Sequence, residues 1–308
     1  MGAPLRFGVV LANDGATIDR VAEQLGRLEA LGFDHAWMPG IPNGPDILTL
    51  LAVAGRSTAA IEIGSAVVPA YPRHPATLAQ QALTVDDALG GRFTLGLGLS
   101  HRKVIEDHLG LSYDQPVAYM RDYLEILRPL LAVRSVDYSG PRLRTRFWLD
   151  VVHTAEAAPP VMLAALGARM LELAGQLADG AMTWMGGLRT IEHHVVPRVT
   201  AAAEAAGRPP PRVLVSLPVM LTDDRDAAWV LANNQFALYG RLPAYRTALE
   251  RDGAATPGDV ALLGDERTLE TAIGRLRDAG VTDFQATPFG DPPTVERTIE
   301  FLAGRPGG

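Results

Sequence analysis

Two glycine-containing segments could bring polar side chains and free backbone groups to a ligand. Residues 96–101 (GLGLSH) place two glycines before Ser100 and His101, and residues 184–187 (WMGG) place two glycines before a helical pattern. Glycine at a strand end lets a ligand or a neighbouring backbone approach closely. Glycines before a helix leave N–H groups that can bind a phosphate. The alternatives are an ordinary loop histidine at position 101 and a plain turn at 184–187.

The residues needed for dinucleotide binding, metal binding or serine-dependent hydrolysis are weakly represented or absent. The G-x-G pair is a weak dinucleotide-binding signal, because His101 stands where the third glycine belongs and the segment is the fourth predicted strand. We expect no metal site: His193 and His194 are adjacent on a helix and point about 100° apart. No G-x-S-x-G motif and no obvious Ser-His-Asp order is present.

The predicted strand ends are apolar. They carry Pro39, Val68, Leu99 and Ala165, so no pair of buried carboxylates can be named as an acid and a base. A mouth of this kind favours a flat organic cofactor and an apolar small-molecule substrate over hydrolysis.

Composition narrows the class of protein further. The 308 residues carry 28 Lys plus Arg and 35 Asp plus Glu, a formal charge of −7, without a basic stripe for nucleic acid or an anionic membrane. No apolar run approaches the roughly 18 residues of a membrane span and no signal-peptide pattern is present, so we expect a soluble, cytoplasmic protein. Cysteine is absent and Lys103 is the only lysine, which excludes thiolate chemistry and leaves one candidate for a Schiff base.

Short apolar runs alternate with amphipathic helical patterns along the whole chain. We expect strands over residues 5–11, 35–38, 61–68, 93–99, 161–165, 180–184, 212–221 and 283–287. We expect helices over 17–31, 47–59, 75–89, 115–133, 168–177, 189–206, 225–238, 267–279 and 293–303. Eight strand–helix units predict a single (β/α)8 TIM-barrel domain over 1–308, with a doubly wound open sheet as the alternative. Two stretches break the rhythm and are interpreted as insertions: a hairpin over 134–158 and an irregular segment over 239–264.

Residues 63–100 resemble the signature stretch of the bacterial luciferase-like superfamily of flavin- and deazaflavin-dependent oxidoreductases. The matching motifs are G-x-x-V at 64–67, R-H-P at 73–75 and G-G-R-x-x-L-G-x-G at 90–98. GFDHAW (32–37) and LADGAMTWM (177–185) extend the resemblance over nearly the whole chain. Residues 104–127 are further similar to a subgroup that uses coenzyme F420.

The resemblance implies positions for a cofactor. A cis peptide at Ala66–Val67 would back the cofactor ring, and Ser100 would lie close to that ring. The segments that hold the cofactor tail and phosphate would be Ala164–Ala165 and the turn at Trp184, Met185, Gly186 and Gly187. Trp37 and Met38, with Trp184 and the second insertion, are expected to shape the substrate cleft. The resemblance also implies a homodimer, with the helices after the second and third strands in contact.

The chain departs from its relatives at two places. Several deazaflavin-dependent relatives carry an Asp-His or similar pair after the second strand, where this chain has Gly40 and Ile41. Gly187 also stands in place of a phosphate-binding lysine of some relatives, so binding there would rest on backbone N–H groups.

These observations lead to one main hypothesis and two alternatives. We expect an oxidoreductase that transfers a hydride between coenzyme F420 and an organic substrate. Without the polar pair, reduction of an activated C=C or C=N bond is favoured over alcohol oxidation, with His101 or solvent supplying the proton. The alternatives are an FMN-dependent monooxygenase that uses reduced flavin and oxygen, and a non-catalytic flavin-binding protein.

Overall fold

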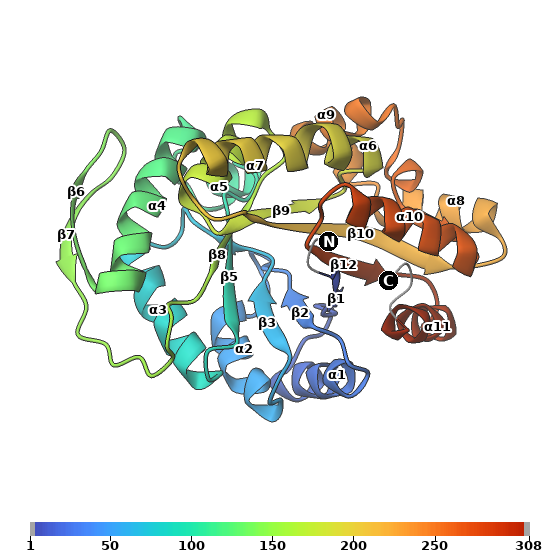
Figure 1. Cartoon of the computed structure of the whole chain (residues 1–308), viewed down its shortest axis with the longest axis horizontal. Helices are drawn as coiled ribbons and strands as arrows, with labels where there is room; N and C mark the ends of the chain where they lie inside the picture. The colour runs from blue at the N-terminus through green and yellow to red at the C-terminus, as the bar shows by residue number, and fades with distance from the viewer. Residues whose placement is uncertain (1–3, 305–308) are drawn as a thin grey trace.

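Eight parallel strands close into a barrel in the computed structural model, which describes residues 4–304 (Figure 1). The barrel strands are β1 (Arg6–Val10), β2 (His35–Met38), β3 (Glu62–Ser65), β5 (Phe93–Gly98), β8 (Val161–Ala164), β9 (Gly180–Trp184), β10 (Arg212–Leu221) and β12 (Asp283–Pro288). β12 pairs with β1 and β9 pairs with β10, so the sheet is continuous around the barrel. The predicted (β/α)8 barrel is confirmed, and the open-sheet alternative is wrong.

Helices surround the strands (Figure 1). They are α1 (Ile18–Ala30), α2 (Ile47–Ala54), α3 (Pro75–Ala88), α4 (Pro116–Val133), α5 (Ala168–Leu177), α7 (Val196–Ala205), α8 (Arg225–Gln235), α10 (Glu266–Asp278) and α11 (Pro292–Ala303). Aspartate side chains define several starts: Asp46, Asp224, Asp265 and Asp291 each accept the N–H of the residue three positions on. Such N-cap bonds satisfy N–H groups that have no partner within the helix.

Some predicted boundaries differ from the structure. The helix expected over 47–59 ends at Ala54, where a short 3₁₀ turn follows. The strand expected over 61–68 is divided into β3 and β4 (Val68–Pro69). The helix expected over 189–206 begins at α6 (Leu188–Thr190) and continues through one π-helical segment into α7.

The first insertion is the predicted hairpin. Its strands β6 (Ser135–Ser139) and β7 (Arg144–Trp148) pair antiparallel and project from the barrel beside α4 (Figure 1). Asp122, buried on α4, holds the hairpin: its carboxylate accepts the Tyr138 hydroxyl at 2.8 Å and the N–H groups of Arg142 and Leu143 at 2.6 and 2.8 Å.

The second insertion, 239–264, was expected to be irregular. This expectation is wrong, because the segment contains α9 (Pro243–Asp252) and β11 (Leu262–Gly264). β10 is ten residues long and pairs with β9 only through its first five, Arg212 to Ser216. β11 pairs in parallel with the last three, from Val219 to Leu221. β11 therefore pairs with the part of the β10 edge that extends beyond β9.

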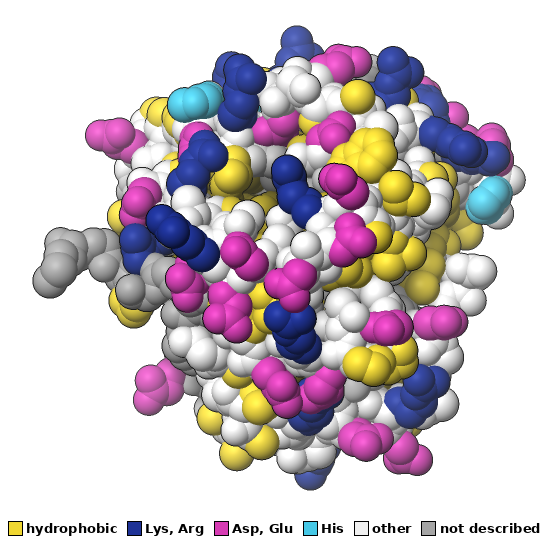
Figure 2. Space-filling view, turned by 90° about the vertical axis from the view of Figure 1, so that its right-hand side faces the viewer, with side chains coloured by type: hydrophobic (Ala, Val, Ile, Leu, Met, Phe, Trp, Pro, Cys, Tyr) yellow, Lys and Arg dark blue, Asp and Glu magenta, His cyan; other side chains and the backbone are white. Residues whose placement is uncertain are grey.

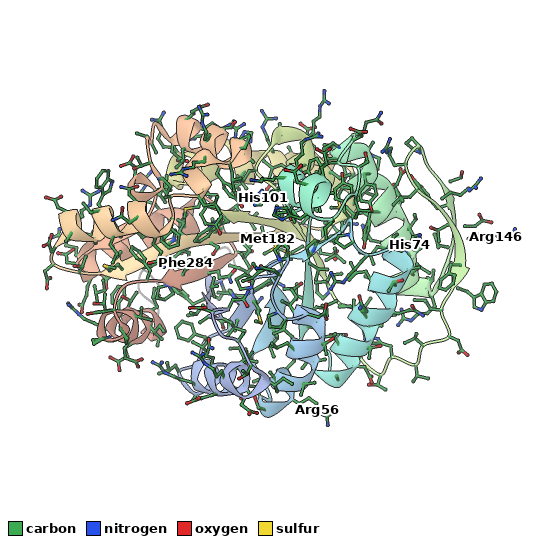
Figure 3. All side chains as sticks on the ribbon, turned by 180° about the vertical axis from the view of Figure 1, so that it is seen from behind. Arg56, His74, His101, Arg146, Met182 and Phe284 are labelled. Atoms are coloured by element: carbon green, nitrogen blue, oxygen red, sulfur yellow. The ribbon has the colours of Figure 1, made fainter. Side chains whose placement is uncertain are left out.

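Alternate residues of each strand face the barrel interior or the helices. Inward-facing Trp37, Met162, Met182 and Leu214 form a cluster inside the barrel (Met182 is labelled in Figure 3). Gly64 on the neighbouring strand makes room for the indole, because a Cβ there would lie 2.3 Å from the Trp37 ring. This cluster fills the middle of the barrel, which is thus a packed core rather than a pore.

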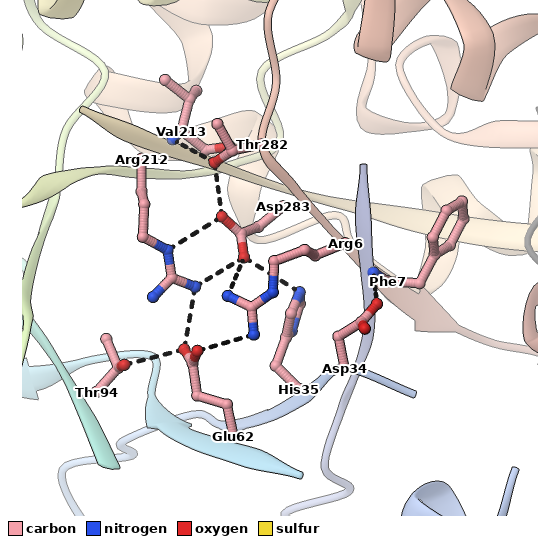
Figure 4. Close-up of polar contacts among 10 residues, drawn as sticks. All are labelled: Arg6, Phe7, Asp34, His35, Glu62, Thr94, Arg212, Val213, Thr282 and Asp283. Atoms are coloured by element: carbon pink, nitrogen blue, oxygen red, sulfur yellow. Dashed lines mark hydrogen bonds and ion pairs between the residues drawn. The ribbon is translucent and has the colours of Figure 1, made fainter. Parts of the chain in front are cut away.

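Charged residues close the amino-terminal end of the barrel (Figure 4). Arg6 and Arg212 each pair with both Glu62 and Asp283, at N···O distances of 2.7 to 3.1 Å. Burial alone would raise the pKa of Asp283, but the hydrogen bonds and charge of Arg212 outweigh it and lower that pKa. Since the ligand sites of such barrels lie at the opposite end, this ion-pair cluster has a structural role.

The outer surface mixes both signs of charge. Figure 2 shows Asp and Glu side chains interspersed with Arg side chains over the face formed by α8, α10 and α11. Between residues 4 and 304, no helix has the length and apolar character needed to cross a membrane.

Candidate active site

The peptide bond between Ala66 and Val67 is cis and lies between β3 and β4, at the carboxyl end of the third barrel strand. The position implied by the family resemblance is thus confirmed. Two glycines make room for this segment. A Cβ on Gly98 would lie 2.5 Å from a Val67 methyl, and a Cβ on Gly40 would lie 2.3 Å from the Val67 carbonyl oxygen. A polar side chain at position 40 would therefore require this segment to move.

Two further strand ends have an uncommon backbone. Ser100, after β5, has φ 62°, and Met185, after β9, has φ 59°. A non-glycine residue in this left-handed region costs about 1 kcal/mol or more, and such residues cluster at ligand sites. Met185 is fully buried, and its N–H donates to the Ser216 carbonyl at 3.4 Å.

His101 lies beside α9, and Ser100 lies beside the loop that precedes α4. The Ser100 carbonyl accepts the Tyr113 hydroxyl at 3.3 Å, and the ring centroids of His101 and Tyr245 are 6.1 Å apart. Figure 3 shows His101 near the centre of the view, whereas Arg146 of the hairpin lies at the periphery. Burial lowers the pKa of His101 below its usual 6.5. Once protonated, this imidazolium is a stronger acid than an exposed one.

An aromatic wall continues from His101 along the second insertion. Tyr245 contacts Tyr239 at 5.1 Å between ring centroids, Tyr239 contacts Trp184 at 5.5 Å, and Trp184 contacts Phe236 at 5.8 Å. Three pairs are edge-to-face, an arrangement that stabilises aromatic clusters. The 239–264 segment therefore brings the Tyr239 ring to Trp184, and its part in shaping the substrate cleft stays a prediction.

Two of the expected cleft residues are buried. Trp37 has no exposed surface and packs inside the barrel, beneath the mouth. Met38 also has none, and it packs in the core between strands and helices. Trp37 and Met38 thus expose no surface at the mouth, and their expected part in shaping the substrate cleft stays a prediction. Successive strand residues face opposite sides, so Met38 points away from the barrel interior.

The end of β8 requires a similar correction. Ala165 is buried in the helix-side core, and its N–H donates to the Met182 carbonyl at 3.0 Å. Its side chain and N–H are thus not available to a cofactor. Ala164 is half-exposed and packs against the cluster inside the barrel, so it is the residue of this pair that faces the mouth.

The turn after β9 already holds a negatively charged group. The N–H of Gly187 and the N–H of Thr190 both donate to the Asp252 carboxylate, each at 2.9 Å. The N–H of Gly187, expected to bind a phosphate, therefore has a partner within the chain. Gly186 is buried, and a Cβ there would make ordinary van der Waals contacts, the nearest at 3.4 Å with Leu166.

A second cluster of rings was not identified as part of a site from the sequence. Tyr71 stacks on Tyr119 at 4.3 Å and lies 5.2 Å from Tyr113, which contacts Ser100. Tyr119 and Tyr123 show helical spacing, but nothing in the sequence connects them to Tyr71. Asp252 was also missed, because only the fold brings it to Gly187.

The residues at the mouth fit a flat heterocyclic cofactor. Eleven buried side-chain polar atoms have no hydrogen-bond partner among the described residues, and three of them belong to residues at or just after the carboxyl ends of barrel strands: Asn13 Oδ1 after β1, Trp184 Nε1 on β9 and Thr287 Oγ1 on β12. Buried polar groups normally have partners. A ring with donors and acceptors at its edge fits these atoms, and the glycines beside Val67 allow close approach. Over residues 4–304, no group of three His, Asp or Glu side chains could hold a metal ion.

Known proteins share both the sequence pattern and the fold. The family model described as luciferase-like monooxygenase matches residues 4–304. A 5,10-methylenetetrahydromethanopterin reductase of Methanolobus tindarius is 27% identical over 97% of this chain and 98% of its own. A Mycobacterium tuberculosis protein described as "putative coenzyme F420-dependent oxidoreductase" is 30% identical over 91% of this chain and 85% of its own.

Solved structures share this fold. The coenzyme F420-dependent tetrahydromethanopterin reductase of Methanopyrus kandleri has a TM-score of 0.83 at 24% identity, covering 98% of both chains. An FMN-bound Baeyer–Villiger monooxygenase component from Pseudomonas putida has a TM-score of 0.78 at 18% identity, covering 99% of this chain and 98% of that one. At these identities the two structures establish the fold alone. With the family model matching nearly its full length, the chain belongs to the luciferase-like monooxygenase family of oxidoreductases.

Proposed function

We propose that this protein transfers a hydride between coenzyme F420 and an organic substrate, and that it reduces an activated C=C or C=N bond. The observation that carries the proposal is the set of buried, unpaired polar atoms of Asn13, Trp184 and Thr287 around a glycine-lined mouth. F420 rather than FMN is favoured by the 30% identity to the Mycobacterium tuberculosis protein described by that cofactor.

The chain's own residues would bind and orient the reactants. When bound, the deazaflavin supplies the carbon that donates or accepts the hydride. Gly98 and Ala164 keep bulk away from the ring, and the aromatic wall around Trp184 excludes water from the reacting carbons. Catalysis then depends mainly on the proximity of donor and acceptor.

The direction of reaction follows from which groups can move a proton. Reduction of C=C or C=N needs one proton for each hydride, and protonated His101 would supply it: burial lowers the pKa of His101, which makes the imidazolium less abundant near neutral pH but a stronger acid once formed. Oxidation of an alcohol would need a base close to the hydroxyl. Some relatives carry a polar pair after β2 that could act as this base. This chain has Gly40 and Ile41 at those positions, and neither side chain has a basic group.

Titration of the purified protein with F420 and with FMN tests the proposal. We expect saturable F420 binding, and F420-dependent loss of an activated alkene or imine with one hydride transferred per product. Tight FMN binding with oxygen-dependent product formation and no F420 affinity would instead establish the monooxygenase. Cofactor binding without turnover of any alkene, imine or aldehyde would establish a binding protein.

We also propose that the protein forms a homodimer through α2 and α3. Val53 on α2 is 48% exposed, an apolar side chain on the helix expected to meet a second copy. Light scattering on the purified chain measures the mass directly, and replacement of Val53 by aspartate should shift it toward the monomer. A wild-type mass equal to one chain would refute the proposal.

A further inference from the structure

One face of α9 carries Tyr245, Ala248 and Asp252, which recur at helical spacing and therefore lie on the same side of the helix. The Ala248 carbonyl accepts the Thr190 hydroxyl at 3.1 Å. The Asp252 carboxylate accepts the N–H groups of Gly187 and Thr190, each at 2.9 Å. These bonds hold this face of α9 against the turn after β9, and they fix the position of Tyr245 with it.

The half-buried ring of Tyr245 contacts both His101 and Tyr239, with centroid distances of 6.1 and 5.1 Å. Its hydroxyl has no hydrogen-bond partner among residues 4–304 and is not one of the buried polar atoms, so it is accessible. The same holds for both ring nitrogens of His101. A phenol and an imidazole, each free to bind a ligand, thus lie side by side after the carboxyl end of β5.

Tyrosine hydroxyls that stabilise the fold elsewhere have partners within the chain. The Tyr123 hydroxyl donates to the Arg73 carbonyl at 2.9 Å, and the Tyr138 hydroxyl donates to the Asp122 carboxylate at 2.8 Å. A tyrosine whose ring is packed among other side chains normally has such a partner for its hydroxyl. Because the Tyr245 hydroxyl is accessible and lies beside the proposed proton donor His101, it suits a ligand at the mouth.

We propose that Tyr245 is a further catalytic residue, whose hydroxyl donates a hydrogen bond to the carbonyl oxygen of an α,β-unsaturated ketone while His101 protonates the α-carbon of the same molecule. The inference rests on the proposed function and narrows its substrate class to activated alkenes that carry a carbonyl group. In such a ketone the oxygen and the α-carbon are separated by two bonds, so two neighbouring side chains can serve both atoms.

The step balances with one hydride and one proton. Addition of the hydride, which the reduced deazaflavin supplies as it is oxidised, to the β-carbon breaks the C=C π bond. The electron pair of that bond moves into an enolate, whose negative charge lies largely on oxygen. The hydrogen bond from Tyr245 strengthens as this charge develops and so lowers the barrier. The His101 imidazolium then gives its proton to the α-carbon and becomes neutral. Burial and the neighbouring Tyr239 raise the pKa of Tyr245 above its usual 10, which keeps the hydroxyl protonated near neutral pH.

Tyr245→Phe removes the hydroxyl and keeps the ring that packs on His101 and Tyr239. With reduced F420 and cyclohexenone as the probe, kcat should fall by about 10², whereas KM should stay within threefold, because the hydrogen bond strengthens in the transition state. The free energy of unfolding in urea should not fall, since the lost hydroxyl has no partner in the chain. The matched control Tyr138→Phe should show the opposite pattern. It removes a hydroxyl bonded to Asp122, so stability should fall and turnover should remain that of wild type.

Infrared difference spectroscopy gives a readout that needs no turnover. Isotope-labelled cyclohexenone bound beside oxidised F420 should have a carbonyl stretch at lower wavenumber in wild-type protein than in Tyr245→Phe, because a hydrogen bond weakens the C=O bond. An equal kcat or an equal stretch in the two proteins would overturn the proposal, and so would a loss of kcat accompanied by a loss of stability. F420 binding without reduction of cyclohexenone would overturn the substrate class. Absence of F420 binding would refute the proposed function itself.

Discussion

The guanidinium of Arg212 donates hydrogen bonds to both carboxylate oxygens of Asp283, with Nε 3.2 Å from Oδ2 and Nη2 2.7 Å from Oδ1. Arg212 is the first residue of β10 and Asp283 the first of β12, so the pair joins two adjacent barrel strands at their amino ends. The Asp283 side chain is completely buried. Arg6 and Glu62 complete the ion-pair cluster from β1 and β3.

Replacing Asp283 by asparagine should destabilise the fold by about 3 kcal/mol, because it leaves two partly buried arginines with a single carboxylate. The change lies at the end of the barrel opposite the mouth, so cofactor affinity should remain within threefold of wild type. Urea unfolding measures the first quantity and fluorescence titration the second. Asp137→Asn, which removes an exposed partner of Arg146, is the control and should shift stability by less than about 0.5 kcal/mol. Equal effects of the two substitutions would show that the cluster does not stabilise the barrel.

His35 should make the fold less stable in mild acid. The pKa of this enclosed histidine is lowered to about 4, and burial is the largest cause. The negative charge of Asp283, 3.7 Å away, raises the pKa but does not outweigh burial. In the unfolded chain, His35 therefore becomes protonated near pH 6.5, whereas in the folded chain it becomes protonated only near pH 4. Stability is full above pH 6.5 and falls between these values, by on the order of 3 kcal/mol. Urea unfolding at pH 7 and pH 4.5 measures the loss, which should be smaller for His35→Leu than for wild type. An identical loss in both proteins would assign it to other groups.

Gly98 should be sensitive to a single added methyl group. Its Cβ would lie 2.5 Å from Val67 and 3.3 Å from Ala164, so Gly98→Ala displaces the segment that forms one side of the mouth. Overpacking of this kind costs about 1–3 kcal/mol. We expect a lower free energy of unfolding and at least a tenfold weaker F420 affinity. Gly167→Ala is the matched control, because a Cβ there meets nothing within 4 Å. Wild-type F420 affinity in Gly98→Ala would mean that this side of the mouth does not contact the cofactor.

The barrel was predictable because each strand is a short apolar run followed by a helical pattern. Residue-level placement was harder. Met38 and Ala165 lie one position from inward-facing residues, and a shift of one residue turns a strand side chain to the opposite face. The sequence locates a strand end to within about two residues, which is too coarse to decide which side chain faces the mouth.

Contacts between residues that are far apart in the sequence could not be predicted from the sequence pattern. Asp252 binds an N–H 65 residues away in sequence, and no periodicity links it to Gly187. The second insertion was interpreted as irregular because its prolines and glycines obscured α9, although one proline only begins that helix at Pro243. β11 is three residues long and is stabilised by the free edge of β10, which cannot be seen in its own residues.

His101 is the residue whose substitution most directly tests the proposed proton transfer. His101→Asn keeps a polar group of similar size but cannot donate a proton to carbon or nitrogen, so we expect turnover of a C=C or C=N substrate to fall by about 10² or more. F420 affinity should stay within threefold. Since burial lowers the pKa of His101 below 6.5, the acidic form accumulates only as pH falls toward that pKa. Wild-type turnover should therefore rise from pH 8 to pH 6, and this rise should disappear in His101→Asn. A variant that retains the same pH profile would assign the proton to solvent, with His101 only packing against Tyr245.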